Sequence, residues 1–125
     1  MPRPEVAVVE DNADNQLLIE AILGFDYRLR FYWDGVEALD GLRGSVPDAV
    51  LLDISLPGLD GLGVLAELRL DTRLAHLPVV ALTAHALPGD RARFLAAGFD
   101  AYVAKPIVDE DDLREVLARL LKVRR

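Results

Sequence analysis

Residues 49–61 constrain the fold more than any other stretch of the chain. Four consecutive apolar residues, Ala49 to Leu52, are followed directly by Asp53 and then by a segment rich in turn-forming residues. An apolar run without alternation is typical of a strand that is covered on both faces, and such strands belong to parallel sheets. Ligands of open parallel sheets bind outside the carboxyl ends of the strands. The sequence therefore predicts that Asp53 lies where any chemistry takes place.

Further strand and helix patterns alternate along the whole chain. The expected strands are 6–9, 27–33, 47–53, 79–83 and 101–104, and the expected helices are 12–24, 34–44, 60–72, 88–98 and 109–125. Consecutive parallel strands are joined by right-handed helical crossovers, so helices must cover both faces of one sheet. The predicted fold class is α/β, a doubly wound (βα)5 three-layer sandwich. Because residues 27–33 alternate between apolar and polar, we place that strand at a sheet edge.

Apolar residues recur at helical spacing in each expected helix. The first four sets are Leu17, Leu18, Ala21 and Ile22; Val36, Leu39 and Leu42; Leu62, Leu65 and Leu68; and Ala92, Leu95 and Ala96. The last helix has the predicted buried stripe Leu113, Val116, Leu117, Leu120 and Leu121. Acidic residues at the start of this helix and basic residues at its end complement the helix dipole. Pro88 stands where a first helical turn tolerates proline.

Composition excludes several classes of protein. With 125 residues the chain is long enough for one domain, and a hydrophobic fraction of 52% excludes a disordered chain. A net charge of -7 argues against binding to nucleic acid or to a membrane surface, which are both anionic. The absence of cysteine rules out disulfides and thiol chemistry. Because no signal peptide or membrane-spanning stretch is visible, we expect a cytoplasmic protein.

Four of the five strand patterns end in polar side chains of different kinds. These side chains are Glu10 with Asp11, Asp53, Thr83 and Lys105. The carboxyl ends of parallel strands lie at one edge of a sheet, so these groups should converge. Carboxylates that lie close together need a cation, and an all-oxygen site favours Mg²⁺ or Mn²⁺. Since Mg²⁺ commonly takes a phosphate as a further ligand, the edge is predicted to handle phosphoryl groups.

These residues match a known family. Glu10-Asp11-Asn12, the stretch Asp53 to Gly61, Thr83-Ala84 and Lys105-Pro106, with Tyr102 three residues before Lys105, resemble the receiver domain of two-component response regulators. The resemblance runs over essentially the whole chain. It implies a flavodoxin-like fold with parallel strand order 2-1-3-4-5. It also implies one receiver domain over residues 1–125, without an output domain.

The resemblance assigns a role to each residue at the strand ends. Asp53 would be the phosphoacceptor and would take the phosphoryl group from a phosphohistidine. Asp11, Asp53 and the backbone carbonyl of Ser55 would hold Mg²⁺, and Glu10 would reach it through water. Lys105 would neutralise phosphoryl oxygens, with its bond to Pro106 in the cis form. Thr83 and Tyr102 would form the switch: Thr83 moves toward the phosphoryl group and Tyr102 turns into the space that it leaves.

The resemblance also defines the expected partners. The phosphodonor would be a histidine kinase or a histidine phosphotransfer protein, which docks on residues 14–18 and 106–108. A downstream protein target would bind the phosphorylated form of this chain. The chain itself would be a monomer or would form a phosphorylation-dependent dimer. The chain would not be an enzyme, apart from catalysing its own phosphotransfer and dephosphorylation.

Three other functions fit parts of the sequence. A Mg²⁺-dependent phosphatase with an aspartyl nucleophile usually has a second acid two residues after the nucleophile, a role that Ser55 cannot fill. A degenerate receiver that serves only for docking would not need the complete set of polar strand ends. Residues 61–66 fit the dinucleotide pattern G-x-G-x-x-A, but eight residues separate them from Leu52, whereas the pattern belongs directly after the strand.

Overall fold

One parallel sheet forms the centre of the computed structural model, which describes residues 3–56, 58–84, 89–107 and 109–124. Its strands are β1 (Glu5–Val9), β2 (Arg28–Tyr32), β3 (Ala49–Asp53), β4 (Val79–Thr83) and β5 (Ala101–Ala104), in the order β2-β1-β3-β4-β5. The helices are α1 (Ala13–Leu23), α2 (Gly35–Gly44), α3 (Gly61–Leu70), α4 (Asp90–Ala97) and α5 (Glu110–Arg124). The predicted fold class and strand order are therefore confirmed.

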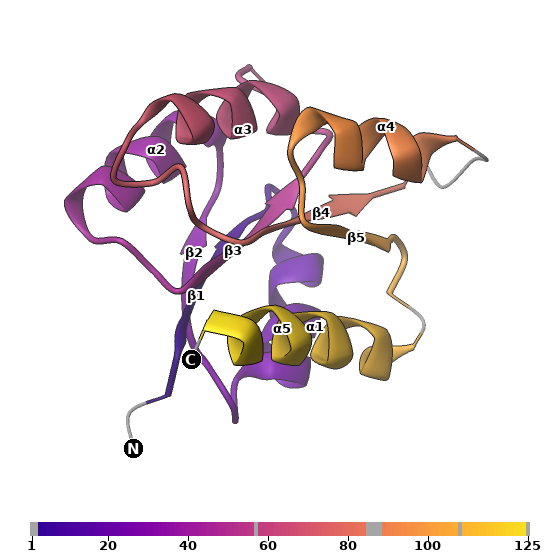
Figure 1. Ribbon diagram of the computed structural model, residues 1–125. Helices are drawn as coiled ribbons and strands as arrows, with labels where there is room; N and C mark the ends of the chain where they lie inside the picture. The colour runs from indigo at the N-terminus through magenta and orange to yellow at the C-terminus, as the bar shows by residue number, and fades with distance from the viewer. Residues whose placement is uncertain (1–2, 57, 85–88, 108, 125) are drawn as a thin grey trace.

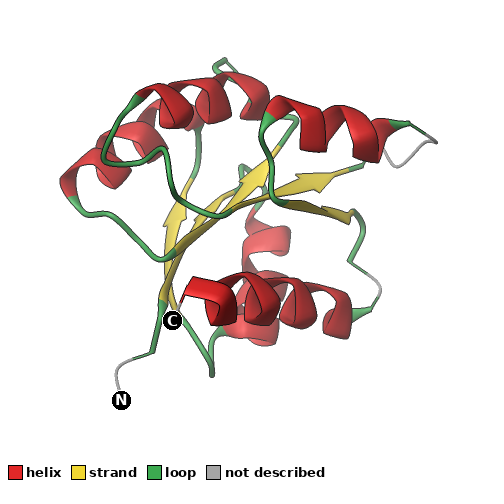
Figure 2. Ribbon diagram, in the orientation of Figure 1, coloured by secondary structure: helices red, strands yellow, loops and turns green. Residues whose placement is uncertain are grey.

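The helices cover both faces of the sheet (Figure 1; Figure 2 shows the same layers by secondary structure). Helices α2, α3 and α4 lie on one face and α1 and α5 on the other. Successive strand residues point to opposite faces, so that Val50 and Leu52 join the core under α2 and α3 while Ala49 and Leu51 join the core under α1 and α5. The apolar strand runs do not alternate because both faces are buried.

Strand β2 is an edge strand, as its alternating pattern predicted. The alternation does not translate into alternating exposure, because Leu29 to Tyr32 are all partly buried. The guanidinium of Arg30 forms an ion pair with Glu5 at 3.0 Å and donates a hydrogen bond to the Ser45 carbonyl at 2.5 Å. Neighbouring segments therefore cover the polar side of this strand.

Polar side chains begin three of the helices. Asn12, Asp34 and Asp60 each accept a hydrogen bond from the backbone N–H of the third residue after them, at 2.8 to 3.0 Å. Helix α4 ends at Gly98, which has a φ of 117° in the left-handed region that glycine adopts without strain. The role predicted for Pro88 lies outside the described residues.

The predicted buried stripes are partly correct in three helices and wrong in α4. Ile22, Leu39, Leu42, Leu65 and Leu68 are buried as predicted, whereas Ala92, Leu95 and Ala96 of α4 are all exposed. Leu17, Val36, Leu62 and Leu95 recur at helical spacing in the sequence but are 64%, 60%, 39% and 40% exposed. Other buried positions on the same helices, which the spacing did not predict, are Ile19, Leu23, Ala38, Val64 and Phe94. These helices carry apolar residues on more than one face, so packing on the sheet, rather than spacing alone, selects the buried face. In α5 the predicted stripe is correct, with Leu113, Leu117 and Leu121 buried.

Candidate functional site

The carboxyl ends of β1, β3 and β4 bring three predicted site residues to one edge of the sheet. Asp53 is level with Leu82, and Thr83 is level with Ala104 on β5, which ends just before Lys105. Glu10 and Thr83 are fully buried and Asp53 is 2% exposed, whereas Asp11 is exposed. Buried acids are rare unless they have partners, so this edge is specialised for polar chemistry.

Lys105 contacts both buried carboxylates. Its Nζ lies 2.8 Å from Oδ2 of Asp53 and 3.2 Å from Oε2 of Glu10. Burial alone would lower the pKa of the ammonium, but the hydrogen bond and the charge attraction to Asp53, together with Glu10, outweigh it and raise the pKa above the ordinary 10.5. The lysine is therefore charged at neutral pH. The peptide bond between Lys105 and Pro106 is cis, as the resemblance implied.

Glu10 is the most strongly enclosed carboxylate of the site. Burial raises its pKa above the ordinary 4.5, and the neighbouring Asp53 raises it further, whereas the hydrogen bond from Asn15 and the charge of Lys105 act in the opposite direction. Three carboxylates, those of Glu10, Asp11 and Asp53, thus lie together at a site where Lys105 contacts two of them.

Glu10, Asp11 and Asp53 fit a divalent cation. Each offers a carboxylate oxygen, and these oxygens all lie within 4.8 Å of one another. An oxygen-only donor set suits a hard cation such as Mg²⁺. The backbone N–H of Ser55 donates to Oδ1 of Asp53 at 2.9 Å, which keeps Ser55 beside this cluster. The carbonyl of Ser55 as a metal ligand remains a prediction.

The loop between β3 and α3 folds back tightly on Asp53. The N–H of Gly61 donates to the carbonyl of Ile54 at 3.1 Å. A Cβ at position 61 would lie 2.7 Å from Cα of Ile54 and would also collide with the carbonyl oxygen of Asp53. Only glycine allows this approach. Gly61 is therefore required by the tight loop before α3, which accounts for the first glycine of the dinucleotide-like pattern.

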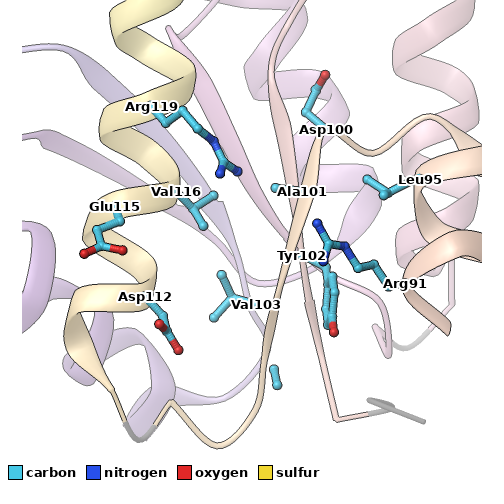
Figure 3. A pocket seen from close by; sticks show the side chains of 11 residues that line it. Arg91, Leu95, Asp100, Ala101, Tyr102, Val103, Asp112, Glu115, Val116 and Arg119 are labelled. Atoms are coloured by element: carbon cyan, nitrogen blue, oxygen red, sulfur yellow. The ribbon is translucent and has the colours of Figure 1, made fainter. Parts of the chain in front are cut away.

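The two predicted switch residues lie on neighbouring strands. Thr83 is buried at the end of β4, and its carbonyl accepts a hydrogen bond from the Lys105 N–H at 2.7 Å. Tyr102 on β5 is partly buried, with its ring centroid 6.4 Å from that of Phe94 on α4. Figure 3 shows Tyr102 and Arg91 on the α4 side of β5, with Val103 and Val116 on the α5 side. Tyr102 thus connects the α4 surface to the strand that leads to Lys105.

Sequence reasoning missed two amides that bind Glu10. Asn15 Nδ2 donates to Oε1 of Glu10 at 2.9 Å, and Gln16 Nε2 donates to the backbone carbonyl of Glu10 at 2.8 Å. The sequence feature that could have indicated these contacts is the position of both residues in the first turns of the helix that follows Glu10. The spacing alone could not show that both side chains turn back toward the strand.

The fold and this edge of buried acids and lysine define a phosphoryl-handling α/β domain, and comparison with known proteins identifies its family. The chain belongs to the response regulator receiver domain family, which matches residues 6–118. It is 42% identical over 108 residues to the polar-differentiation response regulator DivK of Brucella anthropi, covering 86% of this chain and 87% of that protein.

Solved structures agree with this assignment. The receiver domain of a sensor histidine kinase from Pseudomonas aeruginosa PAO1, crystallised with a magnesium ion coordinated in its active site cleft, is 39% identical with a TM-score of 0.86, covering 96% of this chain and 98% of that one. A putative response regulator from Chloroflexus aurantiacus is 28% identical with a TM-score of 0.89 and the same coverage. The receiver class expected from the sequence is confirmed.

Proposed function

We propose that this receiver domain accepts a phosphoryl group on Asp53 from a phosphohistidine, in a Mg²⁺-dependent reaction, and then changes its partner binding. The observation that carries the proposal is the position of Asp53. Its carboxylate is 2% exposed, lies 2.8 Å from the Lys105 ammonium and shares a cation-sized cluster with Glu10 and Asp11. The magnesium in the cleft of the related Pseudomonas aeruginosa receiver supports this interpretation.

The proposed reaction is a phosphoryl transfer between two proteins. A carboxylate oxygen of Asp53 forms a bond to phosphorus while the bond between phosphorus and the donor imidazole nitrogen breaks. Phosphoryl transfer depends mainly on positioning and on neutralisation of the phosphoryl oxygens. Lys105 supplies one positive charge at that place, and the buried Thr83 is the proposed hydrogen-bond donor. The protein that donates the phosphoryl group is a histidine kinase or a histidine phosphotransfer protein.

The cation completes the neutralisation of charge. Glu10, Asp11, Asp53 and the carbonyl of Ser55 are the proposed ligands, with Glu10 acting through water. When bound, Mg²⁺ supplies positive charge to the phosphoryl oxygens in the transition state. We expect Mn²⁺ to substitute because it takes similar oxygen ligands.

Thr83 and Tyr102 are the proposed switch. Movement of Thr83 toward the phosphoryl group would free space beside β5 for the Tyr102 ring, which packs near Phe94 on α4. Hydrogen bonds that involve a charged group contribute about 1.5 to 3 kcal/mol each. Two such bonds would shift a conformational equilibrium by about a hundredfold or more. The altered surface of α4, β5 and α5 would then bind a downstream protein. The receiver would do so as a monomer or as a phosphorylation-dependent dimer.

We propose that residues 1–125 form one receiver domain, which acts in the cytoplasm. It would not be an enzyme beyond its own phosphotransfer and dephosphorylation. Donor docking is proposed on residues 14–18 and 106–108, of which Val108 lies outside the described residues.

Labelling with a small phosphodonor tests the proposal. The chain is incubated with Mg²⁺ and acetyl phosphate, and the product is analysed by intact-protein mass spectrometry. We expect one hydroxylamine-sensitive phosphoryl group, and none with Asp53→Asn or after removal of divalent cations. Asp60→Asn is the matched control, since Asp60 caps α3 in the same loop and asparagine caps equally well.

Other outcomes would contradict the proposal. Labelling that survives in Asp53→Asn would identify another acceptor. Continuous turnover of the donor without a stable adduct would indicate a phosphatase. A folded protein that neither takes up phosphate nor turns it over would be a docking module.

A further inference from the structure

Two consecutive amide side chains of α1 bind the same acidic residue. Asn15 donates to a carboxylate oxygen of Glu10 and Gln16 to its backbone carbonyl, at 2.9 and 2.8 Å. Glu10 is fully buried, and both amides are only partly exposed. The two bonds act differently: Gln16 holds the backbone at the end of β1, and Asn15 sets the direction of the side chain.

The start of α1 keeps Asn15 in place. The Asn12 side chain accepts a hydrogen bond from the Asn15 N–H at 3.0 Å, and the Asn12 carbonyl accepts one from the Gln16 N–H at 3.0 Å. Because the capped first turn fixes the Asn15 backbone, its short side chain reaches Glu10 with little rotational freedom. The amide is therefore a preorganised donor.

We infer that Asn15 is a positioning residue that holds the Glu10 carboxylate at the cation site. This inference rests on the proposed function. Lys105 also donates to this carboxylate, with its Nζ 3.2 and 3.4 Å from the two oxygens. Lys105 brings a positive charge that competes with a cation, and it must direct that charge to the phosphoryl group during transfer. Asn15 is neutral, so it orients Glu10 without cancelling the negative charge that a cation needs.

Asn15 would remain bound to Glu10 while Lys105 changes partner. Groups that orient the residues around a metal site change metal affinity although they do not touch the metal. Asn15 would thus determine cation affinity through the placement of one carboxylate.

Magnesium titrations of the full chain, followed by amide chemical shifts, test this role without measuring phosphotransfer. Removal of an orienting partner typically weakens metal binding by about tenfold or more, so we expect about a tenfold rise in the Mg²⁺ dissociation constant for Asn15→Ala. Gln16→Ala leaves the carboxylate bond intact and should weaken binding less than Asn15→Ala. Alanine at position 15 favours the helix and keeps the backbone bond to Asn12. Thermal unfolding followed by circular dichroism verifies that each variant is folded.

A double-mutant cycle shows whether Asn15 acts through Glu10. In a Glu10→Ala background, Asn15→Ala should change the Mg²⁺ affinity by less than about twofold. Wild-type affinity of Asn15→Ala, or an equal loss in both backgrounds, would overturn the inference and leave the proposed function intact. Failure of the wild-type chain to bind Mg²⁺ would instead overturn the proposed function, and the inference with it.

Discussion

The Nζ atom of Lys105 lies 2.8 Å from Oδ2 of Asp53, although 52 positions separate the two residues. The contact forms because β3 and β5 both border β4, with Asp53 level with Leu82 and Ala104 level with Thr83. Since the same ammonium also contacts Glu10, one lysine balances part of the charge of two buried acids. Changes at this edge should therefore alter stability as well as chemistry.

Replacement of Lys105 should destabilise the fold in the absence of divalent cations. Lys105→Met leaves Asp53 and Glu10 without their cationic partner, and loss of a charged hydrogen-bond partner costs about 2 kcal/mol. Added Mg²⁺ should raise the unfolding temperature of the variant more than that of the wild-type chain, because no ammonium competes for the carboxylates. Differential scanning calorimetry with and without Mg²⁺ measures both effects. Equal stability of the two proteins without Mg²⁺ would contradict the prediction.

Neutralisation of Glu10 should stabilise the fold at neutral pH. The folded-state pKa of Glu10 is raised above 4.5, mainly by burial, so its ionised form at pH 7 weakens the folded state. We expect Glu10→Gln to unfold at a higher temperature than the wild-type chain at pH 7. The advantage should shrink as the pH falls through the raised pKa and vanish below 4.5, where Glu10 is protonated in both states. Thermal unfolding over this pH range checks the sign, and a variant that is less stable at pH 7 would refute it.

A methyl group at Gly61 should disturb the loop that follows Asp53. Its Cβ would lie 2.7 Å from Cα of Ile54, so backbone must move, and overpacking of this kind costs about 1 to 3 kcal/mol. Gly44→Ala is the matched control, because a Cβ at Gly44 has no neighbour within 4 Å and alanine favours the helix. Urea unfolding should show a loss for Gly61→Ala and none for Gly44→Ala. Equal stability of the two variants would show that the loop yields easily.

Arg69 should contribute strongly to stability through backbone contacts. Its guanidinium donates to the carbonyls of Ala75, Leu77 and Gly98 and to the carboxylate of Asp100, at 2.7 to 3.2 Å. These bonds connect α3 to the segment before β4 and to the end of α4. We expect Arg69→Met to lower the free energy of unfolding by about 2 to 3 kcal/mol.

Arg73→Met provides the comparison for Arg69. Arg73 is paired with Asp71 at 3.7 Å and its side chain is 63% exposed. Exposed ion pairs contribute about 0 to 1 kcal/mol, so this variant should unfold close to the wild-type chain in urea. A similar loss for both variants would mean that charge, rather than the backbone bonds of Arg69, provides the stability.

Much of the site was predictable because its residues occupy a recognisable place along the chain. Asp53, Thr83 and Lys105 each follow an apolar strand pattern, and carboxyl ends of parallel strands share one edge. The edge position of β2 was predictable from a different pattern, the alternation of apolar and polar residues along that strand. The strand order and the individual roles came from the family resemblance, because hydrophobic periodicity does not state which strands are neighbours.

The buried faces of the helices were harder to predict. Leu17 and Val36 have the spacing of core residues but are exposed, and Ile19 and Ala38 are buried beside the correctly predicted Ile22, Leu39 and Leu42. Several helices are apolar on more than one face, so the spacing fits more than one rotation of the helix. Contact with the twisted sheet selects the rotation.

The amino-acid sequence alone defined the strands, the helices and the kinds of polar groups at the strand ends. Those patterns depend on residues that are neighbours along the chain. Folding in three dimensions set which groups meet: Lys105 with Asp53 and Glu10, Arg69 with four separate partners, and the Asn15 amide with a carboxylate rather than with solvent. Such contacts depend on sheet order and helix rotation, which are decided by packing between segments distant in the sequence.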